Sequence, residues 1–153
     1  MKSYKFSIIS TLVVLTFLIG CKTSRLDGYK ATSTDEEEII QTLIKSQNAW
    51  NNSEEKDFVA EFCNNGVFAH RTLASSRGEK RKVSKDEITN IFDDAHGNMG
   101  YFNLVNPKII INGDKATVRG SNADVSIPVN IKILLGRENE KWCIEDWDYF
   151  TGL

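Results

Sequence analysis

The sequence predicts a single α+β domain that follows an N-terminal export segment. Two capping boxes begin at Thr34 and Ser84, and each is followed by apolar residues at helical spacing. From residue 125 to 133, apolar residues instead alternate strictly with polar ones, which is the period of a half-buried strand. Asn112-Gly113-Asp114 is a strong hairpin signal between two apolar runs. Helices followed by an antiparallel meander define an α+β fold.

Three helices are expected. The first begins near Thr34 and ends at 51–53, where Asn-Asn-Ser breaks the pattern. The second stops at 64–66, because Asn and Gly tolerate left-handed backbone. The third starts at the Ser84 box and ends at 97–100. The apolar positions that support them are Ile40, Leu43, Ile44 and Trp50, then Phe58, Val59, Phe62 and Cys63, then Ile88, Ile91, Phe92 and Ala95.

Strands are expected in the rest of the domain. Residues 67–70 are short, apolar and partly β-branched, and residues 72–82 are expected to form a hairpin that ends in the basic run Lys80-Arg81-Lys82. Four further strands follow. Their expected ranges are 102–111, 115–119, 125–133 and 141–150. The apolar phase changes from even to odd positions after the second of these, which a turn or bulge near 120–124 explains.

The N-terminus predicts export and lipid attachment. Lys2 and Lys5 precede about 15 uncharged residues, which is typical of a signal peptide. Leu18-Ile19-Gly20-Cys21 resembles the lipobox of bacterial lipoproteins. The resemblance implies cleavage before Cys21, a diacylglyceryl group on its thiol and an acyl chain such as palmitate on the new amino terminus. The alternatives are an uncleaved anchor and an ordinary secretory signal.

These segments predict three parts of the chain and its location. Residues 1–20 are the signal peptide, 21–33 a polar tether that carries the lipid, and 34–153 the domain. The protein is therefore expected in the bacterial cell envelope, attached to the membrane through Cys21. Lys22 favours the outer over the inner membrane.

Charge and cysteine content limit the possible functions. Without residues 1–20 the chain has 17 basic and 21 acidic residues, a net charge of −4, which does not favour nucleic-acid binding. Cys63 and Cys143 remain after lipidation, either as a disulfide, which an oxidising envelope permits, or as two buried thiols. There is no CxxC spacing and there are two histidines, so neither a metal nor another cofactor is expected.

Residues 34–150 resemble the nuclear transport factor 2-like superfamily, which includes ketosteroid isomerase and polyketide-cyclase-like proteins. The resemblance rests on the order and spacing of five short segments. These are Trp50-Asn51-Asn52, Asp57 to Phe62, Val67 to His70, the capped helix after Ser84, and Glu140 to Ile144. The resemblance implies a curved antiparallel sheet wrapped around the helices as a cone with one open end.

His70 is the best catalytic candidate. The resemblance places it at the end of the short strand, where ketosteroid-isomerase-like members carry an acidic general base. Imidazole can move protons near neutral pH. The chain departs from that pattern at Leu43, where a catalytic Tyr is expected. Asp93, Asp94 and His96 form a second polar group, most simply explained as a solvated helix end.

The last strand offers acids among aromatic residues. Alternation predicts that Glu145 and Trp147 share one face, and that Trp142, Ile144, Asp146 and Asp148 share the other. An acid beside an aromatic wall suits a binding pocket. The candidate ligand-binding residues are Trp50, Phe68, His70, Trp142 and Asp146. The alternative is a solvated acidic face with aromatic core or dimer contacts.

Two functions follow from these observations. The first is a lipid-anchored, non-enzymatic protein that binds a small apolar molecule or an envelope protein, with a homodimer as a further expectation. The second is an isomerase, dehydratase or hydrolase with His70 as general base. The basic run 80–82 could meet an acidic partner or anionic headgroups.

Overall fold

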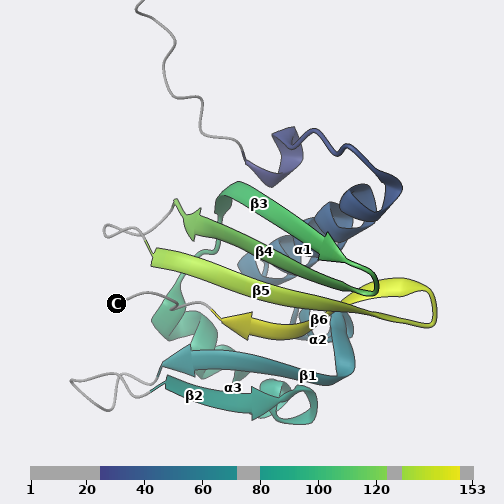
Figure 1. Cartoon of the computed structure of the whole chain (residues 1–153). Coiled ribbons are helices and arrows are strands. Elements are labelled where there is room, and N and C mark those ends of the chain that lie inside the picture. The colour runs from purple at the N-terminus through teal and green to yellow at the C-terminus, as the bar shows by residue number, and fades with distance from the viewer. Residues whose placement is uncertain (1–24, 72–79, 124–128, 149–153) are drawn as a thin grey trace, which may run out of the picture.

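The structure is a computed structural model that describes residues 25–71, 80–123 and 129–148. Its helices pack against one side of a curved six-stranded sheet (Figure 1). The elements are η2 (Leu26–Gly28), α1 (Thr34–Asn51), α2 (Glu55–Ala60), β1 (Phe62–Arg71), β2 (Lys80–Ser84), α3 (Lys85–Met99), β3 (Leu104–Asn112), β4 (Lys115–Asn122), β5 (Val129–Glu138) and β6 (Lys141–Asp148). The α+β prediction is confirmed.

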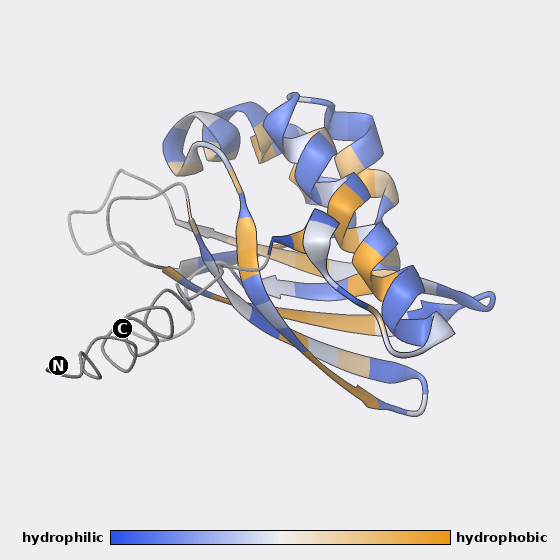
Figure 2. Cartoon of the chain, turned by 90° about the horizontal axis from the view of Figure 1, so that it is seen from above, coloured by the Kyte–Doolittle hydropathy of each residue, from blue (hydrophilic) through white to orange (hydrophobic). Residues whose placement is uncertain are grey.

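The strands lie in the order β2-β1-β6-β5-β4-β3. The β3–β6 meander is antiparallel as predicted, whereas β1 enters the sheet parallel to β6. Seen from above, the described helices gather on the concave side of the sheet, and none of them covers the other side (Figure 2). We call these sides the inner and outer faces of the sheet.

Two tight turns join strands of the meander, and the first of them is the one predicted at Asn112-Gly113-Asp114. Gly113 and Asp114 join β3 to β4, and Gly113 has a φ of 58°. Asn139 and Glu140 join β5 to β6 with φ values of 49° and 65°. The change of apolar phase is also explained, because the chain reverses between β4 and β5 so that Val118 lies opposite Ile133. Val125 and Ile127 lie outside the described residues.

The first and third helices match their predicted ranges. The N-cap of α1 is Ser33 rather than Thr34, because the Ser33 hydroxyl accepts a hydrogen bond of 3.2 Å from the Glu36 amide. The capping box of α3 is formed by Ser84 and Glu87 as predicted. This helix ends at Met99, where Gly100 follows with a φ of 64°.

The predicted extent of the second helix is wrong. Helix α2 ends at Ala60, and Phe62 and Cys63 begin β1 instead. Tertiary contacts override the helical spacing, because Phe62 pairs with Ile144 of β6 and Cys63 forms a disulfide with Cys143. Gly66 allows β1 to approach β6 closely, since a Cβ there would lie 2.7 Å from the Ile144 carbonyl oxygen.

Part of the segment that was expected to be a tether packs against the domain. Arg25 forms a bridge to Val105 on the edge strand β3, and Leu26 is 2% exposed in the core. Among the described residues, the packed part of the chain therefore includes Arg25 and Leu26 as well as the residues from Thr34 onwards. None of the helices in the described part of the chain is long and apolar enough to cross a membrane.

Candidate functional site

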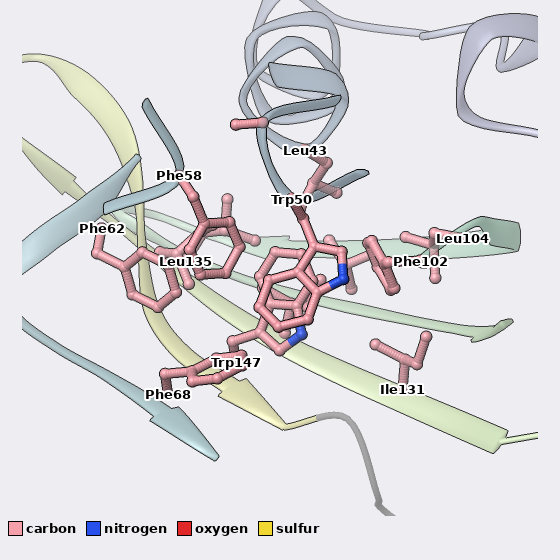
Figure 3. Close-up of a cluster of buried hydrophobic side chains, with 14 of the residues drawn as sticks. Leu43, Trp50, Phe58, Phe62, Phe68, Phe102, Leu104, Ile131, Leu135 and Trp147 are labelled. Atoms are coloured by element: carbon pink, nitrogen blue, oxygen red, sulfur yellow. The ribbon is translucent and has the colours of Figure 1, made fainter. Parts of the chain in front are cut away.

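Aromatic side chains fill the space between the helices and the inner face (Figure 3). Phe58 is central: its ring centroid lies 5.2 Å from Trp50, 5.2 Å from Phe62 and 5.5 Å from Trp147. We call this group the aromatic cluster. Its members, each no more than 2% exposed, are Trp50, Phe58, Phe62, Phe68, Phe92, Phe102 and Trp147. The cone expected from the sequence is therefore a packed core over the described residues.

One polar group in the cluster lacks a partner among the described residues. The Trp50 indole N–H donates to the Gly100 carbonyl oxygen over 2.8 Å. The Trp147 indole nitrogen is buried, and no described residue accepts a hydrogen bond from it. A buried donor without an acceptor costs about 1–3 kcal/mol, so a hydrogen-bond acceptor that entered the cone would be attracted to this N–H.

The predicted sharing of faces along the last strand is wrong. Leu135 lies opposite Ile144 and Leu134 lies opposite Asp146, so Glu145 is the extra residue of a β-bulge. The bulge shifts the alternation by one residue. Trp147 therefore returns to the core with Ile144, while Asp146 lies on the outer face.

The structure separates the candidate ligand-binding residues. Trp50 and Phe68 belong to the aromatic cluster. On the outer face, Asp146 accepts a hydrogen bond of 2.6 Å from the Lys82 ammonium. Trp142 lies at the helix side of the sheet, where its carbonyl accepts from the Thr42 hydroxyl over 3.3 Å.

An open groove lies beside Trp142. It runs between the exposed side of α1, the end of α2 and the β5–β6 turn, and its volume is about 670 Å³. Its lining residues are Thr34, Glu37, Glu38, Gln41, Thr42, Lys45, Ala60, Glu61, Glu140, Lys141, Trp142 and Cys143. Asp35 and Arg137 form an ion pair next to it, and the Arg137 guanidinium carbon lies 4.8 Å from the Trp142 ring centroid.

A second groove of about 350 Å³ continues from the first. The two share Lys45, Ala60 and Glu61, and the second adds Glu54 and Asp57. We call the pair the acidic groove. Its carboxylates are Glu37, Glu38, Glu54, Asp57, Glu61 and Glu140, against the two ammonium groups of Lys45 and Lys141.

Glu61 lies where the two parts of the acidic groove meet. Burial raises the pKa of its carboxyl above the ordinary value, Lys45 opposes this shift, and Asp57 adds to it. Because the folded protein holds this proton more tightly than the unfolded chain does, the ionised carboxylate weakens the fold at pH values above the raised pKa.

We expect Glu61→Gln to raise the melting temperature at pH 7. The gain should shrink as the pH falls through the raised pKa, and it should vanish below the ordinary pKa of glutamate, where the wild-type carboxyl is also neutral. Thermal unfolding of both proteins across this pH range measures the difference. A gap that stays constant with pH would contradict burial as its cause.

Comparison with solved structures identifies the fold. An NTF2-like (nuclear transport factor 2-like) protein of unknown function from Pseudomonas putida KT2440 superposes with a TM-score of 0.62 at 18% identity, covering 80% of this chain and 91% of that one. The fold is nuclear transport factor 2-like. A protein of unknown function with a cystatin-like fold from Nostoc punctiforme gives a TM-score of 0.57 at 18% identity, covering 78% and 96%. An NTF2-like protein with a cystatin-like fold from Novosphingobium aromaticivorans gives 0.58 at 14%, covering 74% and 79%.

Sequence comparisons add no closer relative. No protein-family model matches the chain, and no curated protein matches it either. The similarity therefore extends to the nuclear transport factor 2-like fold and not to an activity.

The backbone of His70 lies on β1, opposite Arg81 of β2. Its side chain lies outside the described part of the structure, so its role as a general base stays a prediction. His96 is half-buried against the aromatic cluster, with its ring centroid 5.3 Å from Trp50 and 6.0 Å from Phe92. This contact differs from the solvated helix end expected for His96, although Asp93 and Asp94 are exposed.

Cys63 and Cys143 form a disulfide, one of the two states left open by the sequence. The Glu138 carboxylate lies within 4.8 Å of both sulfur atoms and accepts a hydrogen bond of 3.2 Å from the backbone N–H of Asn64. Two thiolates and a carboxylate could hold a metal ion, but the disulfide occupies both sulfurs.

Most residues of the acidic groove were not candidates from the sequence. Glu37, Gln41 and Lys45 have the spacing of an ordinary solvated helix face. Of the groove residues, only Trp142 was a ligand-binding candidate, and Cys143 was a candidate only for the disulfide. Thr42 and Trp142 are 100 positions apart, so their contact is set by the sheet topology. The one local signal is the high acidic content of residues 35–38, which is also what a helix N-terminus favours.

Proposed function

We propose that the chain is a lipid-anchored bacterial envelope protein whose domain binds a cationic segment of a partner protein in the acidic groove. The packed aromatic cluster carries this proposal, because it occupies the space that a small apolar ligand would need. A binding function at the surface is therefore favoured over a function inside the cone.

The lining of the acidic groove supports a peptide as its occupant. Pockets for small apolar molecules are enclosed and lined mostly by apolar and aromatic side chains. This groove is open, and carboxylates outnumber ammonium groups along it. A segment with several Lys or Arg residues would bring complementary charge, which raises the association rate and suppresses wrong partners.

Photo-cross-linking in cells tests the site. A photoreactive amino acid at Gln41, inside the groove, should form an adduct with one protein species, and the same amino acid at exposed Asn90 on α3 should not. The adduct should be lost when Glu37, Glu38, Glu61 and Glu140 are replaced by Gln.

A matched variant controls for net charge. Asp27, Asp93, Asp94 and Glu55, replaced by the corresponding amides, remove the same charge from sites outside the groove. This variant should keep the Gln41 adduct. An adduct that survives the groove substitutions, or equal adducts at Gln41 and Asn90, would count against the proposal.

The lipid anchor is tested separately by mass. The intact protein purified from membranes should begin at Cys21 and carry the mass of a diacylglyceryl group and an acyl chain. Cys21→Ala should leave the membrane fraction or remain unprocessed. An unmodified wild-type Cys21 would refute the anchor without affecting the groove.

A further inference from the structure

The outer face of the sheet carries a row of three cations. Lys108 on β3 lies directly opposite Arg119 on β4, and Arg119 lies opposite Lys132 on β5. Val118 and Ile133, their neighbours along the strands, are buried on the inner face. The three cations therefore project from the side that α1, α2 and α3 leave uncovered (Figure 2). Because like charges opposite each other destabilise a sheet, fold stability does not explain this row.

Two other cations on the outer face have acidic partners. Lys82 pairs with Asp146 over 2.6 Å, and Lys115 pairs with Glu145. Among the described residues, no ion pair or hydrogen bond is formed by the side chains of Lys108, Arg119 and Lys132. Asp148, which follows Lys132 in the row, is buried and engaged in an interaction of its own. Within the described part of the chain, the row therefore has no anionic partner, and we treat it as a site for an external anion.

The position of the N-terminal segment indicates that such an anion would be a lipid headgroup. Arg25 is held at the edge of β3 by its bridge to Val105, and only Lys22, Thr23 and Ser24 separate it from Cys21. Four Cα steps span at most about 14 Å. If Cys21 carries the lipid, as proposed above, the edge strand that bears Lys108 lies next to the lipid headgroups.

The distribution of charge between the two sides of the domain then indicates which face of the sheet lies against the bilayer. The acidic groove is on the helix side, where an anionic surface would repel it, and the cation row is on the outer face. We infer that the domain docks on anionic lipid headgroups through Lys108, Arg119 and Lys132. Each cation near such a surface favours the docked state roughly fivefold. Docking turns the acidic groove away from the membrane, towards a protein partner.

Quenching by a lipid-borne nitroxide tests the docked orientation. The lipidated full-length protein carries a fluorophore at Ile110→Cys, on the exposed outer face, or at Gln41→Cys, in the groove. It is placed in vesicles of phosphatidylcholine alone or with phosphatidylglycerol. We expect strong quenching at position 110 in the anionic vesicles only, relieved by high salt, and weak quenching at position 41 in both.

Two charge variants make the test specific. Lys108→Gln with Lys132→Gln should abolish the quenching at position 110, and Lys45→Gln with Lys56→Gln, which removes equal charge from the helix side, should retain it. Protein that floats with the vesicles but is quenched equally in both lipids, or at position 41 instead, would overturn the inference. A dimer that shields position 110 from the quencher would also overturn the inference, because a second copy of the chain would then cover the outer face. Protein that fails to float refutes the lipid anchor, and docking with it.

Discussion

Phe58→Ala should lower the free energy of unfolding by about 3–5 kcal/mol, because it removes the centre of the aromatic cluster. The Phe58 side chain is fully buried, and its ring lies against five other aromatic rings. No single neighbour can fill the space left behind, since each is held by the others. Urea unfolding of the two proteins, compared at equal slope, measures the loss.

Ile110→Ala provides the control for this substitution. Ile110 is 64% exposed on the outer face, so its truncation should change stability by less than about 0.5 kcal/mol. Benzene should raise the melting temperature of the Phe58→Ala variant by filling the new cavity and should leave the wild type unchanged. A wild type that benzene stabilises would show that the cone is not filled.

Removing the disulfide should have a comparable effect. The Cys63–Cys143 bond closes a loop of 80 residues, and the chain-entropy model gives about 4–5 kcal/mol for a loop of this length. The loop contains β2, α3 and β3–β5, so without the bond the unfolded chain gains much freedom. Cys63→Ala with Cys143→Ala should lower the urea midpoint accordingly.

Reduction of the wild type supplies an independent check. Dithiothreitol should shift the wild-type midpoint towards that of the double variant and leave the variant itself unchanged. The disulfide would be contradicted by a wild-type intact mass that corresponds to two free thiols. A wild-type urea midpoint that the reductant leaves unchanged would contradict it as well.

The sequence was sufficient to predict those elements whose signals lie within a few neighbouring residues. The capping box at Ser84 and the Gly113-Asp114 turn depend on residues within four positions of each other. The end of α2 was missed, because Phe58, Val59, Phe62 and Cys63 fit a helical stripe as well as the start of a strand. Which of the two forms is decided by β6, about 80 residues later in the chain.

The candidate site was harder to predict for the same reason. A single extra residue at Glu145 moves Asp146 to the outer face, away from Trp142. The polar composition of residues 22–33 conceals the anchoring role of Leu26, whose burial depends on contacts with the domain. The acidic groove combines three elements that no sequence motif links, and the packing of the cone depends on side chains from every layer.

The three tryptophans of the chain allow a direct test of the central claim that binding takes place in the acidic groove rather than in the cone. Trp142 lines the groove, whereas Trp50 and Trp147 lie in the aromatic cluster. Their indole N–H resonances can be followed by NMR in two titrations. One adds a membrane lipid extract, and the other adds the peptide that cross-links to position 41. We predict that the peptide shifts Trp142 alone and that the lipid extract shifts none of the three. The proposed function would be contradicted if the lipid extract shifted the resonance of Trp147 or Trp50 saturably while the peptide left the resonance of Trp142 unchanged.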